Sequence, residues 1–181
     1  HIPLAYGLLF GMPGIPCIYY GSEWGEEGAK APDNDYALRP CFDEPKPNDL
    51  TTFIRRLIAA RHESEALCSG SYHNVVITNH QLVFERRCDS ERMLVAINAS
   101  DSEFTASSHE LQGNFVRALT FPDSSNSPAN AAAAGVAGVA GVADAADDIS
   151  TDESVEKAPE TFSLQGQITM PPYSVQYLKM V

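Results

Sequence analysis

The chain has 181 residues, of which 44% are hydrophobic, 20% charged and 9% aromatic. At this size roughly 68–70% of the unfolded surface becomes buried, and these fractions exclude fibrous and wholly disordered classes. The net charge of −12 argues against a nucleic acid or an anionic membrane as partner, because phosphate binding needs clustered Lys and Arg. No run of 18 apolar residues occurs, so no membrane-spanning helix is predicted.

The four cysteines, at positions 17, 41, 68 and 88, form no Cys-x-x-Cys pair, so no zinc ribbon or redox motif is predicted. Cys17 lies in an apolar run, and we expect it to be a small buried core residue. The spacing is compatible with a reducing compartment; localisation stays open, with the cytoplasm favoured. The chain starts at His1 without Met or a signal peptide, and we interpret it as a fragment of a longer protein.

Residues 1–12 are apolar nearly all round, which predicts a helix buried on most sides. Residues 15–20 form a short unbroken apolar run bounded by turn residues. Such a run is typical of a strand buried on both faces, as in a parallel sheet flanked by helices. Within these two segments we expect four aromatic residues in the core: Tyr6, Phe10, Tyr19 and Tyr20.

Residues 22–49 show no period and are rich in Gly, Pro, Asp, Asn and Glu. This stretch is far longer than an ordinary connection, so it is either functional or disordered. It follows the C-terminal end of the predicted buried strand, where α/β proteins place their sites. We therefore interpret it as a functional loop.

An amphipathic helix is predicted over residues 49–62, with Asn48 or Asp49 as its N-cap. Its apolar residues recur at helical spacing and form one stripe. Arg55, Arg56 and the 61–65 region occupy the other side, which we interpret as a solvated face.

From Ala66 onwards the apolar period changes to two. The strands predicted from this alternation and from the turns between them are 71–78, 81–88, 92–99, 115–121, 165–170 and 174–180. Several short strands at this interval predict an antiparallel β-sandwich or Greek-key domain.

Residues 122–161 interrupt the strand pattern. Residues 123–160 carry a net charge of −7, and 129–146 is Ala/Gly/Val repetition. Low complexity and one-sided charge predict a flexible insertion between two strands. An Ala-rich helix through 129–146 is the alternative, although each of its three glycines would cost about 1 kcal/mol.

The segment PGIPCIYYGSEWG, residues 13–25, resembles the last barrel strand of the alpha-amylase family of retaining glycoside hydrolases. The resemblance continues in order through NDYALR at 34–39, the predicted helix, and the strand segments LVFER, LVAIN and PPYS. It covers nearly the whole chain except 122–161. Within the family, the extended loop favours the neopullulanase, cyclomaltodextrinase and oligo-glucosidase side.

The resemblance implies a mixed α and β fold. Residues 1–65 would be the C-terminal end of a catalytic (β/α)₈ barrel, and 66–181 an antiparallel Greek-key β-sandwich. Retaining glycosidases use two carboxyl groups about 5–5.5 Å apart. In this family they come from barrel strands that would precede His1, so the chain alone is predicted to be inactive, with no catalytic residue of its own.

Four residues of the loop are candidates for substrate contact in the intact enzyme. Asp35 and Arg39 match a pair that hydrogen-bonds sugars of a bound glucan; the alternative is a mutual salt bridge that shapes the loop. Trp24 is either a stacking platform for a sugar ring or a lining residue of the barrel mouth. Glu23 is either a hydrogen-bonding brace or a ligand-contacting residue.

No cofactor and no metal are expected, because the histidines have no Cys or carboxylate partners at zinc-site spacing. The sequon Asn98–Ser100 is interpreted as incidental, because Asn98 ends a predicted strand. The expected partners are an α-glucan oligosaccharide in the intact enzyme and the missing N-terminal barrel portion. Without that portion, residues 1–21 would self-associate or pack onto the sandwich. The alternative function is a non-catalytic structural or carbohydrate-binding β-sandwich module.

Overall fold

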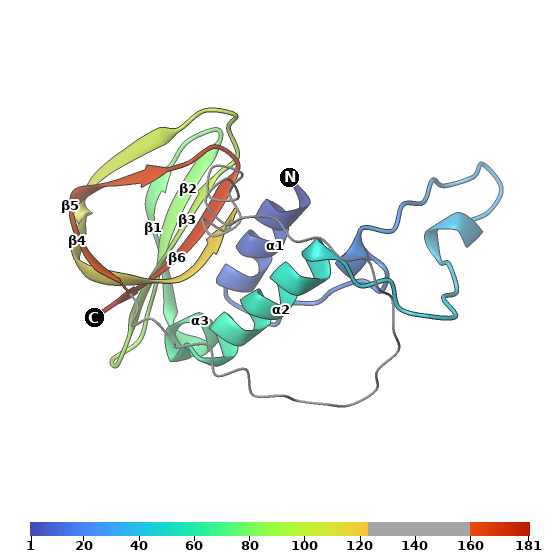
Figure 1. The fold of residues 1–181 in the computed structure, drawn as a ribbon, viewed down its shortest axis with the longest axis horizontal. Coiled ribbons are helices and arrows are strands. Elements are labelled where there is room, and N and C mark those ends of the chain that lie inside the picture. Colours follow the sequence, from blue (N-terminus) through green and yellow to red (C-terminus); the bar gives the residue numbers. More distant parts are fainter. Residues whose placement is uncertain (123–159) are drawn as a thin grey trace, which may run out of the picture.

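The computed structural model describes residues 1–122 and 160–181 (Figure 1). The helical elements are α1 (Ile2–Gly11), the 3-10 turns η1 (Ser22–Trp24) and η2 (Tyr36–Leu38), α2 (Asp49–His62) and α3 (Glu65–Ser69). The strands are β1 (Ser71–Ile77), β2 (Gln81–Arg87), β3 (Arg92–Asn98), β4 (Phe104–Phe121), β5 (Thr161–Met170) and β6 (Ser174–Met180). The predicted mixed α and β class is confirmed. Most of the predicted insertion, including its alternative helix, lies outside the described residues.

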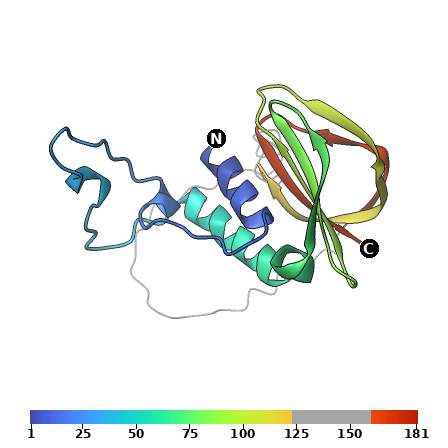
Figure 2. The ribbon, with the colours of Figure 1, turned by 180° about the vertical axis from the view of Figure 1, so that it is seen from behind.

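The six strands form one antiparallel sheet with the order β1-β2-β3-β6-β4-β5. The last strand, β6, is therefore inserted between β3 and β4. Figures 1 and 2 show the sheet curling until its two halves face each other. His73 Nε2 on β1 lies 2.9 Å from Glu110 Oε2 on β4, a contact that bridges the two halves. The expected sandwich thus takes the form of a single curled sheet.

Successive residues of β3 enter two different cores, because side chains alternate between the faces of a strand. Leu94 and Ala96 point into the core inside the curl, whereas Val95 and Ile97 belong to the core outside it. The outer core is shared with α1 and α2, which lie on the same side of the sheet in both views (Figures 1 and 2). Its helical members include Leu4, Tyr6, Phe10, Phe53, Ile54 and Leu57.

Helix α1 confirms the helix predicted near the N-terminus, and Tyr6 and Phe10 are buried as expected. It packs closely on the sheet because Gly7 carries no side chain. A Cβ atom at Gly7 would lie 2.7 Å from a methyl group of Val175 on β6. The Tyr177 hydroxyl, also on β6, donates to the Gly7 carbonyl at 2.6 Å. The outer face of the sheet therefore fixes where α1 lies.

Helix α2 has the predicted bounds and uses Asn48 as its N-cap. The prediction that the 61–65 region is solvated is wrong for Arg61 and Ser64, which are only 6% and 1% exposed. Arg61 Nη1 donates to the Phe10 carbonyl at 2.6 Å, and Nη2 donates to the Gly14 carbonyl at 2.6 Å. These oxygens belong to the end of α1 and the turn after it. A cation at a helix C-terminus is favourable, which explains the burial of this charge.

The strand predicted over residues 15–20 is not formed. The segment is irregular and pairs with no strand among the described residues. Ile15 is 95% exposed, and Cys17, expected in the core, is exposed as well. A strand buried on both faces needs a neighbour on each side, and the curled sheet lies across α1 from this segment (Figure 2).

The remaining predicted strands agree with the structure within a few residues, except at β4 and β5. Strand β4 begins at Phe104, well before the predicted start at residue 115. The register shifts between Ser107 and Gln112, which interrupts the alternation that a sequence pattern relies on. Strand β5 begins at Thr161, four residues before the predicted start.

Candidate functional site

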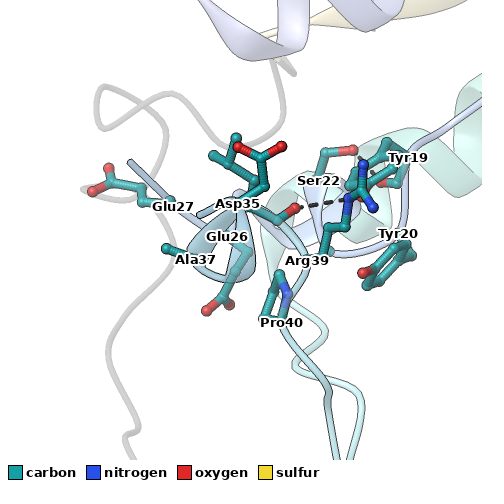
Figure 3. Close-up of a pocket in the computed structure, with 12 residues that line it drawn as sticks. Tyr19, Tyr20, Ser22, Glu26, Glu27, Asp35, Ala37, Arg39 and Pro40 are labelled. Carbon is teal, nitrogen blue, oxygen red and sulfur yellow. Dashed lines mark hydrogen bonds between the residues drawn. The ribbon is translucent and has the colours of Figure 1, made fainter. Parts of the chain in front are cut away.

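A hollow of about 440 Å³ lies over the loop that follows α1 (Figure 3). Three short stretches of the predicted functional loop and its approach form the walls. The lining residues are Tyr19, Tyr20, Gly21, Ser22, Glu26, Glu27, Gly28, Asp35, Ala37, Leu38, Arg39 and Pro40.

Two glycines set the local path of the first two walls. Gly21 and Gly25 bracket η1 with φ angles of 88° and 77°, which residues with a side chain rarely adopt. The turn is closed by the Glu26 amide, which donates to the Gly21 carbonyl at 2.9 Å. The chain therefore reverses around η1, so that residues 19–22 and 26–28 face the same hollow.

The third wall, around η2, packs against the first two. A Cβ atom at Gly28 would lie 2.2 Å from the Ala37 carbonyl oxygen, so only glycine allows this approach. On the other side, the Tyr19 hydroxyl donates to the Leu38 carbonyl at 3.4 Å. These two contacts hold the Asp35–Pro40 stretch in place.

Tyr19 and Tyr20 are not core residues as predicted, since they are 56% and 47% exposed. Their rings lie 4.7 Å apart between centroids and form one side of the hollow. The Tyr19 side chain and desolvation raise the pKa of Tyr20, and the Arg39 guanidinium opposes that rise. Arg39 thus acts electrostatically on Tyr20, and Figure 3 shows its guanidinium on the side of the hollow where the two tyrosines lie.

Asp35 and Arg39 both line the hollow. Two side chains can contact the same ligand only if they line the same hollow. Asp35 Oδ1 pairs with Lys30 Nζ at 3.6 Å, and the described residues show no ion pair between Asp35 and Arg39. In Figure 3 the carboxylate and the guanidinium point to different sides of the hollow. Asp35 Oδ1 accepts no hydrogen bond within the part of the chain that the structure describes. This oxygen is itself buried beside Lys30, so its acceptor capacity is unused among the described residues.

Trp24 and Glu23 lie in η1, outside the lining of the hollow. The Trp24 ring packs edge-on against Phe42 with centroids 5.1 Å apart, and its Nε1 donates to Glu26 at 3.2 Å. The Glu23 carbonyl accepts from the Thr51 hydroxyl at 2.9 Å, while its carboxylate Oε2 is buried without a hydrogen bond to the described residues. The structure does not bring these two side chains together with Asp35 and Arg39.

Sequence reasoning missed Glu26 and Glu27, whose positions in the hollow follow from the reversal at η1. Glu26 is paired with Lys46 at 3.1 Å. The signal that could have revealed them is the spacing of Gly21 and Gly25, which marks a tight turn.

Within residues 1–122 and 160–181, no three His, Cys, Asp or Glu side chains are grouped as metal ligands. None of the helices described has the length and apolar character needed to span a membrane.

No family model matches the chain, but it is similar in sequence to several known proteins. It is 36% identical over 87 residues to an amylopullulanase from Thermoanaerobacter thermohydrosulfuricus, covering 48% of this chain and 6% of that protein. It is 32% identical over 113 residues to a cyclomaltodextrinase from Thermoanaerobacter pseudethanolicus, covering 61% and 19%. The crystal structure of a debranching enzyme from Nostoc punctiforme matches with a TM-score of 0.66 and 23% identity, over 98% of this chain and 30% of that one.

These relatives confirm the predicted resemblance to alpha-amylase family glycoside hydrolases. The debranching enzyme supports the fold across almost the whole chain. The chain spans less than a fifth of the length of the two curated relatives and less than a third of the structural one.

Proposed function

We propose that this relative of the alpha-amylase family glycoside hydrolases forms the C-terminal portion of a retaining α-glucan hydrolase. Its hollow contributes sugar contacts and its curled sheet stabilises the catalytic part. The observation that carries the proposal is the placement of Asp35 and Arg39 on one hollow without an ion pair between them.

The chemistry of the hollow suits a glucan. A carboxylate such as Asp35 accepts hydrogen bonds from neighbouring sugar hydroxyls, and the Arg39 guanidinium donates in a fixed fork. The exposed rings of Tyr19 and Tyr20 offer apolar faces beside these charges. Trp24 lies in the adjacent turn, where it supports the loop or reaches a longer ligand.

The catalytic carboxyl groups would belong to another part of the enzyme. A retaining mechanism needs a nucleophile and an acid about 5–5.5 Å apart, each tuned for its role. In the hollow, Glu26 and Asp35 are engaged by Lys46 and Lys30. The chain alone is therefore expected to release no reducing sugar from maltotriose, and measurable hydrolysis by the purified chain would refute this part of the proposal.

A structural role is the second candidate, favoured by the apolar surface around residues 15–20. A groove of about 520 Å³ runs beside this segment and is lined mainly by Phe10, Ile15, Pro16, Ile18 and Ile58. In this role the surface would be covered by the N-terminal barrel portion of the enzyme or by a second copy of the chain. The two candidates are compatible, since one concerns the loop and the other the surface below it.

The decisive experiment is a ¹H–¹⁵N NMR titration of the full chain with maltotriose, with cellotriose as the β-linked comparison. Maltotriose should shift signals of the loop, and cellotriose should not. Asp35→Asn and Arg39→Gln should each weaken maltotriose binding about tenfold, because each removes a charge-assisted hydrogen bond.

Two matched variants control for charge. Asp33→Asn changes the same charge two residues from Asp35, outside the lining of the hollow. Arg55→Gln removes an arginine from the exposed face of α2. Both should bind maltotriose like the unmodified chain. Binding that is absent from the unmodified chain, or equal in all four variants, would refute the sugar-contacting role.

A further inference from the structure

We propose that Asn48 and Thr51 are positioning residues for the hollow: they tie η1 to the N-terminus of α2 and thereby set the distance between its walls. The inference deepens the proposed function and rests on it for the identity of the ligand. It goes beyond helix capping, which is the ordinary role of residues at these two positions.

Asn48 uses both ends of its side-chain amide. Its Oδ1 accepts from the Thr51 amide at 3.1 Å, which caps α2. Its Nδ2 donates to the Trp24 carbonyl at 2.9 Å, across 24 residues of sequence. Capping requires only the first of these bonds, so the second serves the turn and not the helix.

Thr51 divides its hydroxyl in the same way. Thr51 Oγ1 accepts from the Asn48 amide at 3.2 Å, completing the capping box. The hydroxyl hydrogen has two acceptors within reach, the Glu23 carbonyl at 2.9 Å and Asn48 Oδ1 at 3.3 Å, and the shorter, partly buried contact is the one to Glu23. Two successive carbonyls of η1 are therefore held by two side chains of one helix end.

The position of η1 determines the geometry of the hollow. Residues 19–22 enter the turn and 26–28 leave it, and both stretches line the hollow. Gly21 and Gly25, at either end of η1, have left-handed conformations and little steric constraint of their own. Without the two bonds from α2, the backbone carbonyls of Glu23 and Trp24 would lose these partners, and the turn would keep the Trp24–Phe42 ring contact and the Glu26–Lys46 ion pair. The helix thus supplies the rigid support that a loop-borne site requires.

Asn48→Asp separates the two roles of Asn48. Aspartate caps a helix as well as asparagine does, so the cap on α2 is kept. A carboxylate cannot donate to the Trp24 carbonyl, so the tie to η1 is lost. We expect an unchanged midpoint of urea unfolding, together with maltotriose binding weakened about fivefold.

Trp24 reports directly on the turn, because it is the only tryptophan in the chain. Acrylamide should quench its fluorescence more strongly in Asn48→Asp and in Thr51→Val than in the unmodified chain. Thr51→Ser keeps the hydroxyl and should restore both the weak quenching and the sugar affinity. Ser64→Ala removes the N-cap of α3, away from η1, and should lower stability without changing the quenching of Trp24.

The outcomes distinguish this inference from the proposed function. If the unmodified chain does not bind maltotriose, the sugar role fails, and the quenching of Trp24 alone decides whether the two residues position the turn. If it binds and Asn48→Asp changes neither affinity nor quenching, the positioning role is refuted. The last outcome is that quenching of Trp24 rises in Asn48→Asp and Thr51→Val in proportion to their loss of stability, and that Ser64→Ala shows the same relation. In that case Asn48 and Thr51 act only as helix caps.

Discussion

Glu91 shows how one carboxylate joins three elements. It is nearly buried and accepts from Ser64 Oγ at 2.7 Å and from the Ala66 amide at 2.9 Å, which anchors the start of α3. Lys179 Nζ on β6 lies 2.8 Å from its other oxygen. Burial works against its ionisation, but Lys179 and the two hydrogen bonds outweigh it, so the pKa of Glu91 lies below its ordinary value of 4.5.

Replacing Glu91 by Gln should therefore destabilise the protein in a pH-dependent way. Because the folded-state pKa is lowered, the stabilisation is present above about pH 4.5 and is lost as the pH falls through the folded-state value. At neutral pH we expect Glu91→Gln to reduce the free energy of unfolding by about 1–2 kcal/mol. Urea unfolding at several pH values measures this difference.

The difference between Glu91→Gln and the unmodified protein should shrink as the solution becomes acidic, since a protonated carboxyl resembles an amide. Glu103→Gln, at an exposed turn, is the control and should have little effect at any pH. A Glu91→Gln effect that stayed constant from neutral to acidic pH would show that the carboxylate charge is not what stabilises the fold.

Sequence reasoning at the level of residues succeeds for the apolar side chains of regular helices and strands, but it fails for the exposed residues Cys17, Tyr19 and Tyr20 and for buried polar side chains. Glu91 belongs to a predicted turn, and nothing in a turn sequence distinguishes a buried acid from a solvated one. Arg61 and Arg86 belong to otherwise regular patterns, yet both are buried and donate to carbonyls at the end of α1. Asn98 likewise looks like a glycosylation acceptor, but its side chain is fully buried and donates to the Ser102 and Pro171 carbonyls.

At the scale of elements, a substitution at Gly7 tests how closely α1 packs against the sheet. A methyl group at this position would lie 2.7 and 2.8 Å from the two methyl carbons of Val175. Alanine gains about 1 kcal/mol of helix propensity over glycine, whereas overpacking a core typically costs 1–3 kcal/mol. Because Val175 is fully buried and cannot move away freely, we expect overpacking to prevail. Gly7→Ala should lower the free energy of unfolding by about 1 kcal/mol, as measured by urea unfolding.

Two further variants assign the cause. Ala5→Gly, at an exposed position of α1, calibrates helix propensity in this helix. Combining Gly7→Ala with Val175→Ala should cost less than the two single effects added together, because the second change makes room for the new methyl group. Strict additivity, or a net gain from Gly7→Ala alone, would mean that α1 can shift away from β6 at little cost.

Elements with a regular apolar period could be predicted from the sequence, and those defined by their neighbours could not. Helix α2 combines an apolar stripe with a capping residue, and β6 shows an uninterrupted strand pattern, so both were located correctly. The first half of β4 is polar and contains a register shift, which hides its period. Residues 15–20 have the composition of a buried strand, but strand structure also requires a neighbouring strand.

Only part of the candidate site could be predicted, because the rest of it depends on how the chain folds back on itself. Asp35 and Arg39 were identified from their motif, and both line the hollow. Whether Trp24 and Glu23 share it depends on how the chain reverses at η1, which no local pattern specifies. The contribution of α2 through Thr51 is a contact over 28 residues, and long-range contacts of this kind become visible only in three dimensions.

At the scale of the whole molecule, the helical part and the sheet share one core, yet one surface remains apolar and uncovered. Helix α1 is packed onto the sheet. Ile15 lines the apolar groove together with Pro16 and Ile18, and it is 95% exposed. Contiguous exposed apolar surface of this kind marks an interaction site or a tendency to associate.

We therefore expect the isolated chain to associate with itself in a concentration-dependent way, through the segment around Ile15. Burying one isoleucine contributes about 1.5–3 kcal/mol, so Ile15→Ser should weaken association by about tenfold or more. Sedimentation velocity over a range of protein concentrations measures the effect. Ile77→Ser, at a position 63% exposed on β1, removes an equally large apolar side chain from elsewhere and should leave association unchanged. If the chain sediments as a monomer at every concentration, or if both substitutions act alike, then the surface around Ile15 does not direct assembly, and a second copy of the chain is not what covers it.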